Sequence, residues 1–229
     1  MALRSKDVIR KLEASANPEA VAGMARYGIS PEKTLGISIP VLRRMARETG
    51  TDHGLALDLW ASGIHEARIL ASMVDDPRAV TEEQAESWVS EFDSWDVCDQ
   101  VCMNLFWRAP FAWRKAVEWC GRRAEFEKRA GFALMARLAW QDKKASDGDF
   151  ERLLPVIKRE ATDNRNYVKK AVSWALRQIG KRNLALNRKA VKTAEEIGKL
   201  EEKSARWIAN DALKELESDA VQRRLSASP

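Results

Sequence analysis

The sequence predicts an all-α protein in which short antiparallel helix pairs stack into an α-solenoid. Apolar residues recur with a period near 3.6 almost throughout the 229 residues, while strand-like alternation hardly appears. Glycine and proline are sparse, at 11 and 7 residues, and runs of Ala, Leu, Glu, Lys and Arg dominate. These features favour helices, and a chain of this length buries a sizeable core without disulfides.

The helices follow one another with little between them. We expect them over residues 4–15, 18–27, 39–49, 53–61, 64–75, 82–92, 95–107, 110–120, 124–141, 148–160, 165–182, 186–199 and 203–217. Asn17 before Pro18 predicts a capped helix start, and Thr81 with Gln84 predicts a capping box. Pro40 fits the first turn of the helix that follows it, which argues against a strand at 35–42.

The short connections predict that successive helices pack antiparallel. So many short helices exceed a simple bundle, and the absence of a clear internal repeat indicates degenerate, HEAT-like pairs rather than tetratricopeptide or ankyrin repeats. We expect one domain over 1–222 and a frayed C-terminal tail over 223–229.

The sequence lacks the residues that several kinds of functional site require. Cys98, Cys102 and Cys120 form neither a disulfide framework nor a CxxC pair, and we interpret the first two as small buried thiols. His53 and His65 have no ligand partner at metal spacing, so we expect no metal and no cofactor. No phosphate-binding loop or GxSxG element is present. The charged, amphipathic start and the lack of a membrane-length apolar run predict a cytoplasmic protein without membrane contact.

Positive charge is concentrated in one part of the chain. Residues 156–192 carry eleven Lys and Arg against two acids, a local charge of +9, so the rest of the chain is −4 within a total of +5. A basic block in a mildly acidic body suggests contact with a polyanion such as nucleic acid.

The predicted helix at 95–107 contains the stretch SWDVCDQV and places a carboxylate at an unusual position. Val97, Val101 and Leu105, with the two cysteines between them, form one apolar arc, and Trp95, Asp99 and Phe106 lie at its edge. Asp93 and Asp96 fit the helix start, where negative charge is favourable. Asp99 lies beyond that first turn, so it either pairs with a neighbouring Arg or faces a groove.

The predicted helix at 165–182 presents three different faces. Its core stripe consists of Val168, Ala171, Val172, Ala175 and Ile179. Its opposite side carries Lys170, Arg177 and Lys181, and one flank carries Tyr167, Trp174 and Gln178. A solvated charged face is one interpretation; phosphate contact is the other, favoured by the +9 segment and by the lack of nearby acids in the sequence.

Five segments together resemble the bacterial DNA alkylation repair proteins of the AlkD type. They are MARYGISPEKTLGISIPVLRRMAR (24–47), HEARILA (65–71), WDVCD (95–99), KRAGFALMARLA (128–139) and NYVKKAVSWALRQIGKRN (166–183), and the resemblance covers nearly the whole chain in order. It implies a HEAT-like repeat solenoid whose concave basic groove cups duplex DNA. It also implies excision of cationic N-alkylpurines, chiefly 3-methyladenine and 7-methylguanine, without metal, cofactor or obligatory base flipping.

The resemblance also implies roles for individual residues. The WDxxD element places its Trp and second Asp at Trp95 and Asp99; the groove Arg falls on Arg129, and the second groove Trp on Trp174. Lys128, the residue before Arg129, stands where relatives often have another Arg. Further expected DNA contacts are Tyr27, Lys128, Lys170, Arg177, Lys181 and Arg182. The C-terminal half differs in detail from the best-known members, which affects substrate range more than fold.

These residues suggest a mechanism in which Asp99 stabilises an oxocarbenium-like sugar while Trp95 and Trp174 offer π-faces and Arg129 holds a phosphate. We expect a monomer that acts on double-stranded DNA containing alkylated bases. Two other functions remain open: a non-catalytic HEAT-like nucleic-acid-binding protein, which would be indifferent to Asp99→Asn, and a protein-interaction scaffold, which would show little salt-dependent DNA affinity.

Overall fold

The computed structural model describes residues 5–227, and these contain helices and turns but no strand. The first residue of the expected helix at 4–15, and the last two of the expected tail, lie outside the described range. The all-α fold class is confirmed for these residues. The described residues form two compact units that divide between Pro110 and Phe111, and each unit is described by itself. The single domain over 1–222 remains a prediction.

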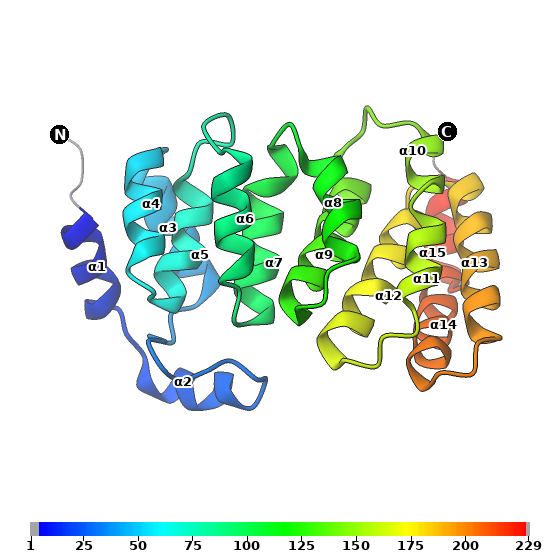
Figure 1. Cartoon of the computed structure of the whole chain (residues 1–229), viewed down its shortest axis with the longest axis horizontal. Helices are drawn as coiled ribbons and strands as arrows, with labels where there is room; N and C mark the ends of the chain where they lie inside the picture. The colour runs from blue at the N-terminus through cyan, green and yellow to red at the C-terminus, as the bar shows by residue number, and fades with distance from the viewer. Residues whose placement is uncertain (1–4, 228–229) are drawn as a thin grey trace. The chain divides into compact units, whose positions relative to one another are not determined.

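The first unit contains the helices drawn from blue to green in Figure 1. They are α1 (Ser5–Ala14), α2 (Pro18–Ala25), α3 (Ile39–Thr49), α4 (His53–Ala61), α5 (His65–Val74), α6 (Glu82–Ser90), α7 (Trp95–Asn104) and the short 3-10 helix η1 (Phe106–Arg108). The ends of α3 and α4 agree with the expectation to the residue. The expected helix at 95–107 is instead divided, because α7 ends at Asn104 and η1 follows.

The predicted helix starts depend on side-chain caps and proline positions. The Asn17 side chain accepts a hydrogen bond from Ala20 N at 3.2 Å, and Pro40 lies in the first turn of α3, as expected. Thr81 caps α6 by accepting from Gln84 N at 3.2 Å. The capping box is incomplete, because the Gln84 amide donates to Asp75 at 2.7 Å instead. Local chemistry thus determines where these helices begin, while a tertiary contact redirects Gln84.

The core of the first unit is organised around α5, which packs against α3, α4 and α7. The indoles of Trp60 on α4 and Trp88 on α6 stack with centroids 4.1 Å apart and an interplanar angle of 3°. Arg68 of α5 covers the Trp60 ring at 4.9 Å and forms an ion pair with Glu91 at 2.8 Å. Two of the nine tryptophans therefore serve the interior of this unit.

The second unit contains the helices from green to red in Figure 1. They are α8 (Ala112–Cys120), α9 (Glu125–Gln141), α10 (Asp147–Glu151), α11 (Leu154–Glu160), α12 (Asn166–Gly180), α13 (Leu184–Gly198), α14 (Lys203–Leu216) and α15 (Asp219–Ser226). The prediction of one helix over 148–160 was wrong, because two helices, α10 and α11, form there. Pro155 lies in the first turn of α11, where it lacks the N–H that would bond Glu151 and its ring opposes a continuous helix.

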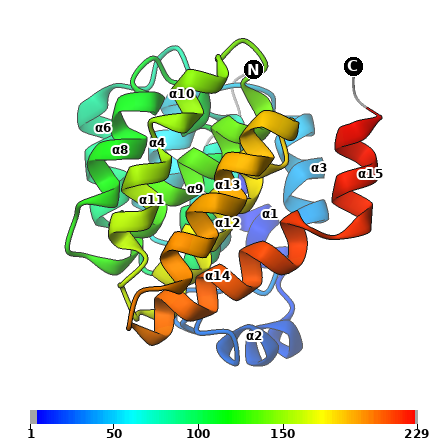
Figure 2. The same ribbon diagram turned by 90° about the vertical axis from the view of Figure 1, so that its right-hand side faces the viewer.

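Close packing in the second unit is centred on α9, which lies between α8 and α12. A Cβ added to Gly131 of α9 would meet Cys120 N at 2.6 Å, so only glycine permits α8 and α9 to approach this closely. From the side, α12, α13 and α14 lie together (Figure 2), in agreement with their mutual contacts.

A further helix forms where the sequence suggested fraying. Residues 223–226 belong to α15, and Leu225 is buried. The Ser218 hydroxyl caps this helix by accepting from Val221 N at 3.4 Å. The tail that was expected to fray from residue 223 is therefore helical as far as Ser226.

Candidate nucleic-acid interface

The α7 helix holds Asp99 at the edge of a fully buried arc. Val97, Cys98, Val101 and Cys102 are buried, whereas Trp95 and Asp99, one turn apart, are both partly exposed. The cysteines are free thiols, as expected. The predicted edge position of Asp99 is thus confirmed by its burial pattern, and its role remains a prediction.

The structure brings Tyr27 and Trp95 together within the first unit. Trp95 Nε1 donates to the Tyr27 carbonyl oxygen at 3.1 Å, while the Tyr27 side chain is 70% exposed. This contact joins the segment after α2 to the start of α7 across 68 positions of sequence. Tyr27 is therefore held beside the WDxxD element by its backbone, with its phenol available to solvent.

The two aspartates of the WDxxD element have different environments. Asp96 Oδ2 lies 2.8 Å from His65 Nε2 of α5. Burial would lower the pKa of His65, but the hydrogen bond and charge of Asp96 outweigh it and raise this pKa above its usual value. Burial likewise opposes ionisation of Asp96, yet His65 and Ser94 lower its pKa. Asp96 therefore links α7 to α5 through its contact with His65.

Arg129 lies in the interior of the second unit. Its side chain is only 6% exposed, and its Nη1 donates to the Tyr167 carbonyl at 2.6 Å. This bond fixes the start of α12 against α9, two turns before Trp174 on the same helix. The burial favours a structural role over the phosphate contact that the resemblance implies.

Lys128, expected to contact DNA, belongs to an ion-pair cluster. Its ammonium donates to Glu160 at 2.7 Å and lies 3.2 Å from Asp163, and its side chain is 12% exposed. Arg165 also pairs with Asp163 at 2.6 Å. Burial alone would raise the pKa of Asp163, but the hydrogen bonds from Arg165 and Lys128 lower it to about 2. Lys128 is thus engaged by two carboxylates.

The basic face of α12 has acidic partners that were not visible in the sequence. Lys181 donates to Glu215 of α14 at 2.5 Å, and Arg177 pairs with the same carboxylate and with Asp211 at 3.4 Å. Burial opposes ionisation of Glu215, but these two cations lower its pKa. The expectation that the segment lacks nearby acids was therefore wrong, because α14 supplies them.

Arg182 and Lys170 differ in their availability to a ligand. Arg182 donates to the Ala139 carbonyl at 2.6 Å and covers the Phe150 ring at 3.9 Å, so its guanidinium serves the interior. Burial lowers its pKa. Lys170 is exposed on α12, and no carboxylate among residues 5–227 pairs with it.

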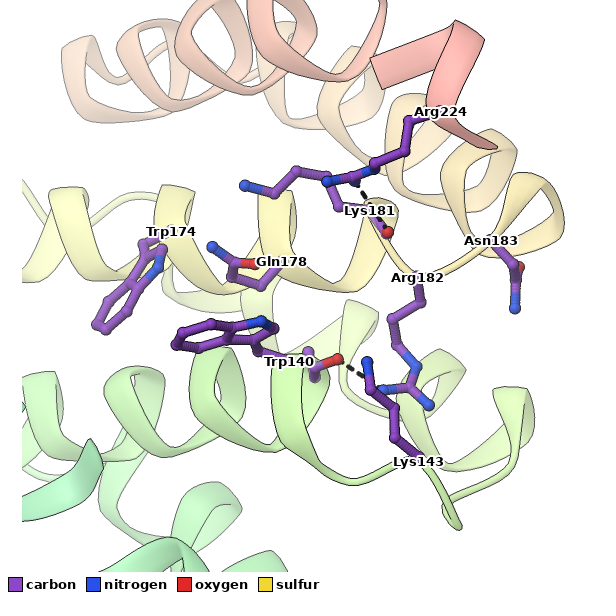
Figure 3. A pocket seen from close by; sticks show the side chains of 9 residues that line it. Trp140, Lys143, Trp174, Gln178, Lys181, Arg182, Asn183 and Arg224 are labelled. Atoms are coloured by element: carbon purple, nitrogen blue, oxygen red, sulfur yellow. Dashed lines mark hydrogen bonds between the residues drawn. The ribbon is translucent and has the colours of Figure 1, made fainter. Parts of the chain in front are cut away.

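Trp174 lines a cleft of about 620 Å³ within the second unit, which we call the Trp140–Trp174 cleft (Figure 3). Its lining comprises Ala139, Trp140, Lys143, Trp174, Gln178, Lys181, Arg182, Asn183 and Arg224. Trp174 Nε1 donates to the Gln178 side-chain oxygen at 3.2 Å in the amide orientation that satisfies both groups. Three expected site residues thus meet here: Trp174, Lys181 and Arg182.

The sequence analysis did not identify three residues that line this cleft: Trp140, Lys143 and Arg224. Trp140 is the last-but-one residue of α9 and is 53% exposed, and Lys143 follows in an exposed turn. The string WQDKK was the available signal for Trp140 and Lys143. A tryptophan at a helix end, next to lysines, is in an unusual setting for a core residue. Arg224 was missed because α15 was not expected.

The described residues offer no group of three His, Cys, Asp or Glu side chains that could hold a metal ion. Over the same part of the chain, no helix combines the length and apolar character needed to cross a membrane.

One comparison with known proteins shows the family, and another confirms the HEAT-like fold. The model of the family described as DNA alkylation repair enzyme matches residues 8–216. The chain is also similar to a solved structure described as "a new family of proteins related to the HEAT-like repeat DNA glycosylases with affinity for branched DNA structures". The TM-score is 0.81 and the identity is 22%, over 97% of this chain and 96% of the other. No match is found among curated proteins.

Proposed function

Because the chain belongs to the DNA alkylation repair enzyme family, we propose that it excises positively charged N-alkylated purines from duplex DNA. Its substrates are 3-methyladenine and 7-methylguanine, and the reaction is hydrolysis of the N-glycosidic bond. The observation that carries this proposal is the environment of Asp99, a partly exposed carboxylate one turn after Trp95 on a helix whose adjacent face is fully buried.

This reaction has little need of a general acid. A cationic alkylpurine is already a good leaving group, so the bond to C1′ breaks as positive charge develops on the sugar. A carboxylate about 4 Å from that charge contributes about 4 kcal/mol at an effective dielectric constant of ~20. We assign this role to Asp99, together with orientation of the attacking water.

An indole acts on the same developing charge. Trp95, held by its hydrogen bond to the Tyr27 carbonyl, presents a π-face that stabilises a cation by roughly 0.5–2 kcal/mol. The contributions of Trp174 and Arg129, which belong to the second unit, remain predictions. The base need not be extruded, since charge stabilisation at the sugar does not require reading the base edge. The protein acts as a monomer at the nucleoid in the cytoplasm.

The test compares wild type with Asp99→Asn on N-methylated duplex DNA in single turnover, measuring released 7-methylguanine and 3-methyladenine. Loss of about 4 kcal/mol corresponds to a rate about a thousandfold lower. Asp93→Asn is the matched control, because Asp93 is an exposed carboxylate just before α7. It should release bases at the wild-type rate.

Three outcomes contradict parts of this proposal. No release by the wild type would leave a DNA-binding protein without glycosylase activity, which is the function suggested by the branched-DNA affinity of the structural neighbour. Equal release by wild type and Asp99→Asn would exclude the role given to Asp99. Equal loss in Asp93→Asn and Asp99→Asn would show a general charge effect.

A further inference from the structure

Two indoles from neighbouring helices line one cleft in the second unit. Trp140 from α9 and Trp174 from α12 point into the same opening, with Gln178 beside them (Figure 3). One face of Trp140 is covered by the Arg137 guanidinium at 4.8 Å, and the side chain is nonetheless 53% exposed. A single exposed apolar ring is ordinary, but two that share one hollow are typical of a binding site.

The charged side chains that line the cleft are all cationic. They are Lys143, Lys181, Arg182 and Arg224, of which Lys181 is already paired with Glu215 of α14, and no carboxylate lines the cleft. Arg224 donates to the Lys181 carbonyl at 3.2 Å, which fixes α15 at one border of the cleft. Lys143 is exposed at the other border, and no carboxylate in the described part of the chain pairs with it. The cleft therefore favours an anion that also has an aromatic face.

We propose that the Trp140–Trp174 cleft binds an unpaired nucleotide of a DNA strand, with its base stacked on Trp140 and its phosphate beside Lys143. A base within a duplex has both faces covered by its neighbours, whereas an unpaired base exposes a face to an indole. Every base has such a face, so the preference is for unpaired structure rather than for sequence. The volume of about 620 Å³ admits a nucleotide.

This inference goes beyond the proposed function. Base excision from fully paired DNA does not require an unpaired nucleotide, and neither Trp140 nor Lys143 has a role in it. The cleft gives the protein a means to remain at bulges, gaps or strand ends. It rests on the family's action on DNA and not on the chemistry of Asp99.

The experiment measures affinity of the full chain for two fluorescein-labelled duplexes by anisotropy. One duplex is fully paired, and the other is identical except for a bulge of three thymidines. Wild type should bind the bulged duplex more tightly. Trp140→Ala should weaken binding to the bulged duplex about tenfold, as expected for loss of one base–aromatic stack, and leave the paired duplex nearly unchanged. Lys143→Ala should act in the same direction and reduce the salt dependence.

Matched controls come from the same unit. Trp207 is a partly exposed indole on α14 that contacts Lys169 and does not line the cleft. Lys144 is exposed beside Lys143 but lines a different pocket, with Trp113 and Asp149. Trp207→Ala and Lys144→Ala should bind both duplexes like wild type.

The outcomes separate this inference from the proposed function. Equal losses on both duplexes, no loss in Trp140→Ala, or full competition by poly-glutamate would overturn the cleft assignment. Release of 7-methylguanine from paired DNA is measured in parallel for wild type and Asp99→Asn. Absence of release with the bulge preference intact would contradict the proposed function alone, and release without the preference would contradict this inference alone.

Discussion

His65 Nε2 lies 2.8 Å from Asp96 Oδ2, and this pair joins α5 to the first turn of α7. Asp96, the first aspartate of the WDxxD element, therefore has a structural role. Asp99, one turn further along, is then the aspartate assigned to the chemistry. The two carboxylates therefore make separate and testable contributions, one to stability and one to base release.

The His65–Asp96 pair should make stability depend on pH. The raised pKa of His65 means that its contribution is complete below pH 6.5 and is lost as the pH rises through the folded value. The lowered pKa of Asp96 means that its contribution is present above about pH 4 and is lost at more acidic pH. Asp96→Asn should therefore cost about 1–3 kcal/mol near pH 5.5 and less near pH 8. Thermal melts of both proteins across this range provide the measurement, and a constant difference in Tm would argue against the pair.

Lys170 and Arg177 should differ in what they contribute to DNA binding. Lys170 is exposed without a paired acid, so Lys170→Ala should reduce the slope of log K against log salt by about 0.9 without lowering Tm. Arg177 is paired with Asp211 and Glu215, so Arg177→Ala should lower Tm and change the slope less. Gel-shift titrations at several salt concentrations test this. An unchanged slope in Lys170→Ala would remove Lys170 from the interface.

Gly131 should tolerate no side chain. Alanine there would place its Cβ 2.6 Å from Cys120 N and 2.8 Å from the Ala116 carbonyl, both of them backbone atoms. Gly131→Ala should lower stability by about 1–3 kcal/mol or more, measured by urea unfolding. Gly23 in α2 is the matched control, because its added Cβ meets nothing within 4 Å. Gly23→Ala should raise stability by about 0.5–1 kcal/mol, and similar losses in both variants would contradict the packing argument.

The charge of the lesion should decide whether it is released. The proposed mechanism depends on a leaving base that is already cationic, so hypoxanthine, which is neutral, should leave far more slowly than 7-methylguanine from otherwise identical duplexes. Chromatography of released bases measures both rates. Comparable rates would contradict this mechanism and indicate that a general acid of the protein protonates the base.

The sequence by itself determined the helical fold class, most helix ends and the edge position of Asp99. These depend on local chemistry: the 3.6-residue period, the cap at Asn17 and the proline at position 40 act within a few residues. The division of the helix at 148–160 was also encoded locally, by Pro155, although the periodicity concealed it.

Only the tertiary structure decided which charged groups are available. Arg177 and Lys181 were expected on an unopposed basic face, and Lys128 was expected to contact DNA. Carboxylates 32 to 38 positions away in the sequence pair with all three. Trp140 and Trp174 likewise share a cleft although 34 positions separate them in the sequence. Periodicity reports which face of a helix is apolar. It does not report which neighbouring helix covers a face, because that depends on long-range packing.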